Sequence, residues 1–209
     1  MKWLLSLLFL VPAGLASAQD EPETLFNGNI HSISGFGGPT TRFTRIAGDG
    51  ALMTGGYGGV LLNNQWGIGG GGFGLATEIK APASIQSTSI EPLYLRLGYG
   101  GFYLEYTQNP NKLLHLNYAM LIGAGGFTYT TKKMDDWDYD GHHNTFFVAE
   151  PFVGMELNVT NWFHPSIGAS YRFIAGENLK GFESKDLSDF TLALNLKFGW
   201  FGNRSWDED

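Results

Sequence analysis

The sequence contains no cysteine, and this absence excludes several kinds of chemistry. Disulfide bonds, cysteine-ligated metals and thiol redox centres all require that residue. A lipid-modified cysteine after a signal peptide is excluded for the same reason. We expect no cofactor, apart from a possible weak Ca²⁺ or Mg²⁺ in an outer loop.

Positive charge is also scarce, with 13 lysines and arginines against 20 aspartates and glutamates and a formal net charge of −7. Removal of the predicted signal peptide, which contains Lys2, changes the sum to 12 − 20 = −8. So acidic a surface argues against a nucleic-acid partner.

A long apolar run is missing except at the start of the chain. There, Lys2 precedes an apolar stretch from Trp3 to Val11, and Ala16-Ser17-Ala18 has the small-x-small pattern of a cleavage site. This stretch is shorter than the roughly 20 residues of a transmembrane helix. We predict a secretory signal over residues 1–18 and one domain over residues 19–209, which is 209 − 18 = 191 residues.

Helical periodicity is absent after the signal, and strand periodicity takes its place. The last predicted strand shows this best, because large apolar residues occupy every second position: Leu192, Leu194, Leu196, Phe198 and Trp200. Small or polar residues lie between them, so the two sets face opposite sides of a sheet. Such a face is typical of a soluble core or of the lipid-facing side of a transmembrane barrel.

Similar runs predict eight strands, separated by short connections rich in Asn, Pro and Gly. The predicted strands cover 28–46, 51–62, 66–79, 92–107, 113–129, 145–157, 162–174 and 187–200. The first is expected to be interrupted from Gly35 to Pro39. Glycine-rich runs in the second and third strands lack the GxxxxGK[ST] phosphate motif, so they predict bulges, sharp coiling or room for large inward side chains.

The connections alternate in length. Short turns follow strands two, four and six, and longer segments cover 37–50, 80–91, 130–144 and 175–186. This alternation is typical of bacterial outer-membrane barrels, whose strands are also longer than the roughly 5–6 residues of soluble proteins. We therefore predict an all-β, eight-stranded antiparallel up-and-down transmembrane barrel with its apolar face outward.

On strand number, loop alternation and the aromatic end Phe198-Gly199-Trp200-Phe201, residues 19–209 resemble the small outer-membrane barrels of the OmpA-transmembrane-domain and OmpX type. The resemblance implies a monomer in the bacterial outer membrane, in contact with its lipid. It also implies a structural or surface-interaction role through the outer loops, with an unknown extracellular or envelope partner and no open pore. Only a short acidic tail, 202–209, follows the last strand, so no periplasmic domain is expected.

Charged and polar side chains are predicted on the inward face of several strands: Arg96, His115, Glu150, Glu156, His164 and Arg172. Because an unpaired buried charge is very costly, these groups are expected to pair and fill the lumen. A proton or ion path is the alternative.

Two further functions stay open. His164-Pro165-Ser166 with Glu177 loosely resembles the His-x-Ser…Glu arrangement of the outer-membrane lipid A deacylase, another eight-stranded barrel. His164 and Ser166 share a face, as a base and a nucleophile must. The first of these functions is that of an enzyme acting on envelope lipid. The other is a secreted soluble barrel that binds a small apolar ligand and has its aromatic face inside.

One predicted outer loop is strongly acidic. Asp136, Asp138, Asp140 and Gly141 fit the start of a calcium loop, D-x-D-x-D-G, but Phe147 occupies the twelfth position in place of the bidentate Glu. This pattern predicts a weak Ca²⁺ or Mg²⁺ site, and a solvated acidic loop is the alternative.

Overall fold

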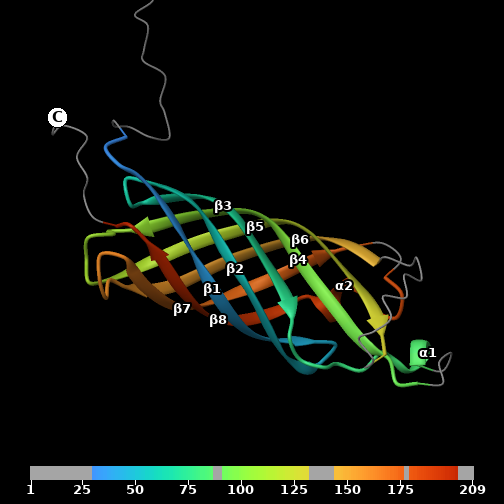
Figure 1. Ribbon diagram of the computed structural model, residues 1–209. Coiled ribbons are helices and arrows are strands. Elements are labelled where there is room, and N and C mark those ends of the chain that lie inside the picture. Colours follow the sequence, from blue (N-terminus) through green and yellow to red (C-terminus); the bar gives the residue numbers. More distant parts are fainter. Residues whose placement is uncertain (1–29, 87–90, 132–143, 177–178, 202–209) are drawn as a thin grey trace, which may run out of the picture.

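The computed structural model describes residues 30–86, 91–131, 144–176 and 179–201. Eight strands form a closed barrel in which every strand pairs with its sequence neighbour and β1 pairs with β8 (Figure 1). The strands are β1 Ile33–Ile46, β2 Asp49–Leu62, β3 Trp66–Leu75, β4 Tyr94–Gln108, β5 Leu114–Thr130, β6 Asn144–Leu157, β7 Phe163–Ala175 and β8 Asp189–Gly199. The eight-stranded antiparallel barrel predicted from the sequence is confirmed.

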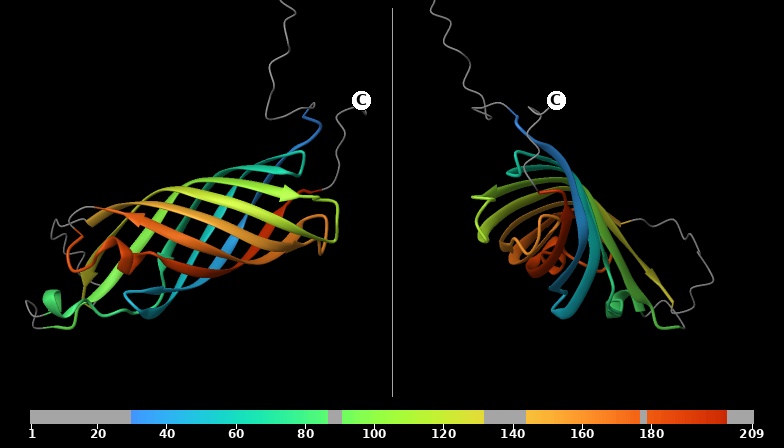
Figure 2. Two further views of the ribbon diagram at one scale, coloured as in Figure 1. Left: turned by 180° about the vertical axis from the view of Figure 1, so that it is seen from behind. Right: turned by 60° about the vertical axis from the view of Figure 1, so that its left-hand side comes forward.

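The barrel has two unlike ends (Figure 2). The turn end carries the short connections 63–65, 109–113 and 158–162. The loop end carries the longer connections and two short helices, α1 Ala83–Gln86 and α2 Ser184–Leu187. None of the helices among the described residues is long and apolar enough to cross a membrane.

The structure corrects two predictions for the first strand and the connection that follows it. Gly35 to Pro39 does not interrupt β1, because these residues pair continuously with β2. Ala47 and Gly48, both with positive φ, form a tight hairpin where the sequence predicted a long 37–50 segment. The length alternation therefore fails at the first connection.

Two other strand ends also differ from prediction. β3 ends at Leu75, and the chain rejoins β4 only through the bridge between Lys80 and Tyr94. Leu187 belongs to α2, so β8 begins at Asp189.

The apolar face lies outside the barrel, as predicted. In β6, Phe146, Val148 and Glu150 are buried, whereas Phe147 and Val153 are exposed. The same alternation holds in β5, β7 and β8. The outer wall is therefore a nearly continuous apolar surface.

Aromatic rings gather on this wall near both ends. Phe198 stacks on Phe163 at the turn end, with ring centroids 5.0 Å apart. Near the loop end Tyr171 contacts Phe173 and Phe190 at 4.5 and 4.8 Å. Aromatic residues near both ends of the outward face are typical of transmembrane barrels.

Pro39 lies within β1 at a gap in the hydrogen-bonded ladder with β8. Between β1 and β8 the pairing passes from Gly37–Phe198 to Thr40–Asn195, which leaves out Pro39. Both strands advance by the same number of residues across this gap, so it is not a bulge. A proline lacks the backbone donor, and at this position the ladder does not use one.

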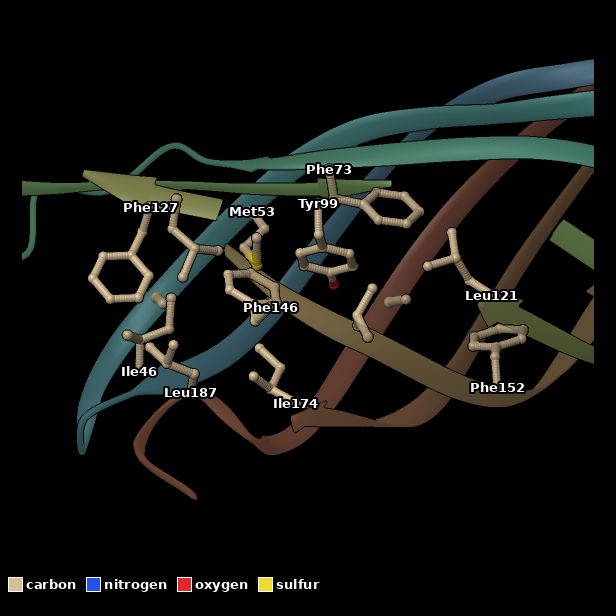
Figure 3. Close-up of a cluster of buried hydrophobic side chains, with 14 of the residues drawn as sticks. Ile46, Met53, Phe73, Tyr99, Leu121, Phe127, Phe146, Phe152, Ile174 and Leu187 are labelled. Carbon is tan, nitrogen blue, oxygen red and sulfur yellow. The ribbon is translucent and has the colours of Figure 1, made fainter. Parts of the chain in front are cut away.

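The core near the loop end is apolar (Figure 3). Ile46, Met53 and Leu187 are fully buried, and the β7–β8 connection folds over this end of the barrel. Phe182 of that connection packs on Phe127 with ring centroids 5.5 Å apart, and the Tyr129 hydroxyl donates to the Lys180 carbonyl at 2.7 Å. Side chains thus fill the interior beneath the loops.

Candidate functional site: the polar interior

The interior near the turn end holds a cluster of buried charges. Lys197 on β8 binds Glu105 on β4, with 2.5 Å between Nζ and Oε1, and also binds Glu156 on β6. The side chains of all three are at most 2 % exposed. Each residue lies at an inward position of its strand, so strands distant in sequence bring the charges together.

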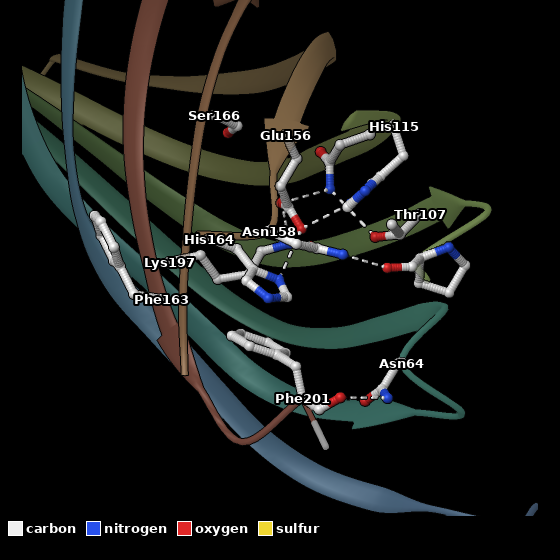
Figure 4. A network of polar contacts seen from close by, with 12 residues as sticks. Asn64, Thr107, His115, Glu156, Asn158, Phe163, His164, Ser166, Lys197 and Phe201 are labelled. Carbon is white, nitrogen blue, oxygen red and sulfur yellow. Dashed lines mark hydrogen bonds and ion pairs between the residues drawn. The ribbon is translucent and has the colours of Figure 1, made fainter. Parts of the chain in front are cut away.

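Two histidines extend this cluster (Figure 4). His115 Nε2 lies 3.2 Å from Glu156 Oε1, and His115 Nδ1 lies 2.9 Å from the Lys112 carbonyl. His164 Nδ1 is 3.5 Å from the same carboxylate oxygen. A carbonyl and a carboxylate can only accept hydrogen bonds, so the doubly protonated imidazolium alone makes both His115 contacts. That form also balances the cluster, because two carboxylates otherwise face a single lysine.

A second cluster lies deeper in the barrel. Glu150 accepts hydrogen bonds from the Tyr99 and Ser170 hydroxyls, both at 2.6 Å, and pairs with Arg42 at 2.6 Å. The Arg42 guanidinium also lies 3.4 Å from the centroid of the Phe73 ring. The carboxylate is thus satisfied from several strands, as a charge in a narrow barrel must be.

Arg172 is fully buried and binds backbone oxygens. Its Nε donates to the Leu187 carbonyl at 2.8 Å, and a terminal nitrogen donates to the Arg45 carbonyl at 3.1 Å. It also contacts Thr44 and Met53. Arg172 therefore links the β7–β8 connection to the C-terminal end of β1.

The structure places five of the six predicted lumen residues inside: His115, Glu150, Glu156, His164 and Arg172. Arg96 is the exception and corrects the prediction, because it is exposed on the outer face. Leu95 and Leu97 take the inward positions beside it, at a level where the interior is apolar. Polarity therefore does not identify the inward face of this part of β4.

Several members of the network were missed from the sequence: Arg42, Tyr99, Glu105 and Lys197. The sequence does indicate that Lys197 faces inward, because it alternates with the large apolar Leu196 and Phe198 on the last strand. Arg42 and Glu105 lie on strands whose faces were not assigned.

A polar cavity of about 280 Å³ opens at the turn end and reaches this cluster. It is bordered by the charged and imidazole groups, by Asn158 of the β6–β7 turn and by Phe201. The Phe201 ring stacks on His164 with centroids 3.8 Å apart. The inner end of the cavity is lined by the paired side chains of Lys197 and Glu156.

The enzyme hypothesis finds no assembled site. The Ser166 hydroxyl accepts a hydrogen bond from Asn195 at 3.1 Å, while His164 is directed at Glu156. His164 and Ser166 are both buried in the lumen, at 7 % and 4 % exposure. Glu177 lies outside the described residues.

The acidic-loop residues Asp136, Asp138 and Asp140 also lie outside the described residues, so the weak Ca²⁺ or Mg²⁺ site stays a prediction. Within the described ranges, no three His, Asp or Glu side chains form a group that could hold a metal ion.

No protein-family model and no curated protein matches the sequence. Among solved structures, Neisserial surface protein A is similar, with 10 % identity, a TM-score of 0.53, and coverage of 81 % of this chain and 97 % of that one. Ail, the attachment invasion locus protein of Yersinia pestis, matches with 14 % identity, a TM-score of 0.43, and coverage of 80 % and 97 %. At 10 % identity the first likeness concerns the fold alone. Together with the closed eight-stranded topology, it shows that the chain has the fold of the small eight-stranded barrels.

Proposed function

We propose that the chain is a monomeric bacterial outer-membrane protein with a structural or surface-interaction role through its loop end and without an open pore. One observation carries this proposal: the barrel wall is apolar on the outside, while its charges are paired on the inside. An apolar outer wall is favourable in lipid and costly in water, and a closed sheet has no open edge that would expose a row of unpaired backbone groups to the lipid.

The soluble-barrel alternative requires the opposite arrangement of faces. Phe102, Ile167, Phe173, Phe190 and Leu192 are each more than half exposed on the wall. In water, so extensive an apolar surface would drive aggregation. The aromatic face that this alternative places around a ligand points away from the interior.

Orientation follows from the connections. Small outer-membrane barrels have short periplasmic turns and longer extracellular loops. The loop end, with α1 and α2, therefore faces the cell exterior in this proposal. Any partner protein is expected to bind there.

This orientation can be tested by surface labelling. Epitopes inserted at Asp138 and at Lys180 are expected to bind antibody on intact cells, and an epitope at Asn109 only after permeabilisation. Fractionation of each strain should recover the barrel with the outer membrane. Labelling at Asn109 on intact cells, without labelling at Asp138, would overturn the orientation, and recovery in soluble extract would overturn the membrane location.

A lipid hydrolase is not supported by the geometry, because the Ser166 hydroxyl is not bonded to His164. Ser166→Ala is therefore expected to leave the acylation of envelope lipid unchanged. Mass spectrometry of lipid A from cells expressing the wild type or the variant measures this directly. A deacylation that the wild type performs and the folded variant does not would restore the enzyme hypothesis.

A further inference from the structure

Arg96 is an exposed cation on an apolar wall. It is the third residue of β4 from the loop end and points outward between the inward Leu95 and Leu97. Within the described part of the chain its guanidinium has no ion pair or hydrogen bond. A charge on the lipid face of a barrel costs about 2–4 kcal/mol at the midplane and about 0–1 near an interface. Because Arg96 lies near the rim, its exposed charge costs little free energy. An anion bound at the same depth would make that charge stabilising.

A groove of about 420 Å³ lies beside Arg96. Strand register explains its shape: Gly74 pairs with Gly98, and Gly98 pairs with Gly126. Three outward positions on adjacent strands thus lack side chains, and the floor of the groove is backbone. Arg96 pairs directly with Thr128, so a guanidinium and a hydroxyl-bearing residue lie side by side at the groove.

Thr145 on β6 completes the border. It is exposed and pairs with Gly126, which places a second hydroxyl-bearing residue at the far side of the same floor. Among the residues that the structure describes, the groove is thus lined by one cation, two residues that can donate hydroxyl hydrogen bonds, and no carboxylate.

Internal packing does not require glycine at two of these three positions, whereas a Cβ at Gly126 would lie 3.0 Å from the Asn144 carbonyl oxygen. A Cβ at Gly74 or Gly98 would meet its nearest atom at 4.0 or 3.4 Å, which is ordinary contact. By contrast, a Cβ at the inward Gly101 would lie 2.2 Å from a carbonyl oxygen. The Tyr171 and Phe190 rings cover the wall over β7 and β8, whereas the groove lies over β3 to β6.

We propose that this groove binds the phosphate group of a phosphorylated lipid in the leaflet at the loop end. Arginine presents a planar fork of donors that matches phosphate, and hydroxyl donors complete the set. The next outward row, Gly72, Gly100 and Ala124, continues the smooth surface toward the middle of the wall, where acyl chains lie. The inference rests on the proposed membrane location, because only a membrane-embedded barrel presents this groove to lipid headgroups.

Native mass spectrometry of the full barrel in zwitterionic detergent, with added diphosphoryl lipid A as the probe, tests the proposal. Wild type is expected to retain the lipid, and Arg96→Gln to bind it roughly tenfold more weakly or worse, as for loss of a charge-assisted bond. Arg45→Gln is the matched control, because Arg45 is also an exposed outward arginine near the loop end but lies outside the groove. Its binding should equal that of wild type.

A second variant separates charge from shape. Gly98→Leu keeps Arg96 but fills the groove, and it is expected to weaken binding as well. Folding of each variant is verified by heat-modifiable gel mobility. Equal binding of lipid A without its phosphates, equal losses for the two arginine variants, or full displacement by millimolar inorganic phosphate would each overturn the lipid-phosphate site.

The two proposals fail in distinguishable ways. Wild-type protein that folds into lipid vesicles but shows no preference for the phosphorylated probe rejects the groove alone. Wild-type protein that stays soluble without detergent rejects the membrane location on which the groove depends.

Discussion

Lys197 is the residue on which the buried charges at the turn end depend. It contacts Glu105 and Glu156, and all three side chains are almost fully buried. Lys197→Met removes the cation and leaves two carboxylates without it. Breaking a buried pair in this way costs about 3–5 kcal/mol, so the urea midpoint of the folded barrel in lipid vesicles should fall clearly.

Lys185→Met is the control for that substitution. Lys185 pairs with Glu183 on the surface of α2, where both side chains are more than 70 % exposed. Exposed pairs contribute little, so the midpoint should stay where it is in the wild type. An unchanged midpoint for Lys197→Met would show that Glu105 and Glu156 are not held by this lysine.

Residue identity alone predicted part of the interior. His115, Glu156 and His164 could be placed because their strands alternate cleanly. Arg96 was misplaced because the inward positions beside it on β4 are taken by the apolar Leu95 and Leu97, although a charged residue, Arg172, is buried near the same end of the barrel. A polar residue on a strand therefore does not by itself indicate the inward face. Which charges meet, as Lys197 and Glu105 do, depends on barrel closure and is not visible in either strand.

At the scale of the strand, closure of β1 against β8 depends on Gly38. A Cβ at this inward position would lie 1.7 Å from the Leu196 carbonyl oxygen, so the backbones approach too closely for any side chain. Gly38→Ala is expected to reduce the folded fraction severely, measured by heat-modifiable gel mobility after refolding. The outward Gly35 on the same strand is the control, because a Cβ there meets its nearest atom at 3.9 Å.

Folding of Gly38→Ala at the efficiency of Gly35→Ala would contradict this close approach. The same geometry explains why the first strand was mispredicted. Glycines and Pro39 indicate an interruption in an isolated strand, yet here they lie where two backbones come close and the ladder omits a donor. β6, with large alternating residues, needed no such correction.

At the scale of the whole molecule, the two ends are closed by different means. Apolar side chains, the buried Arg172 and the β7–β8 connection fill the interior near the loop end, and paired charges occupy it near the turn end. The turn-end cavity of about 280 Å³ meets this cluster. An eight-stranded barrel is just wide enough for side chains to fill it, so no continuous water path is expected.

Planar-bilayer recording tests this closure on the wild-type barrel. We expect no large, stable conductance at molar salt, under conditions in which a porin reconstituted in the same way gives reproducible steps. The clusters of Glu150 and Glu156 would then act as structural filling, since their partners already satisfy them. Reproducible porin-like steps from the pure wild type, abolished by heat denaturation, would instead require these clusters to separate and would favour the ion-path alternative.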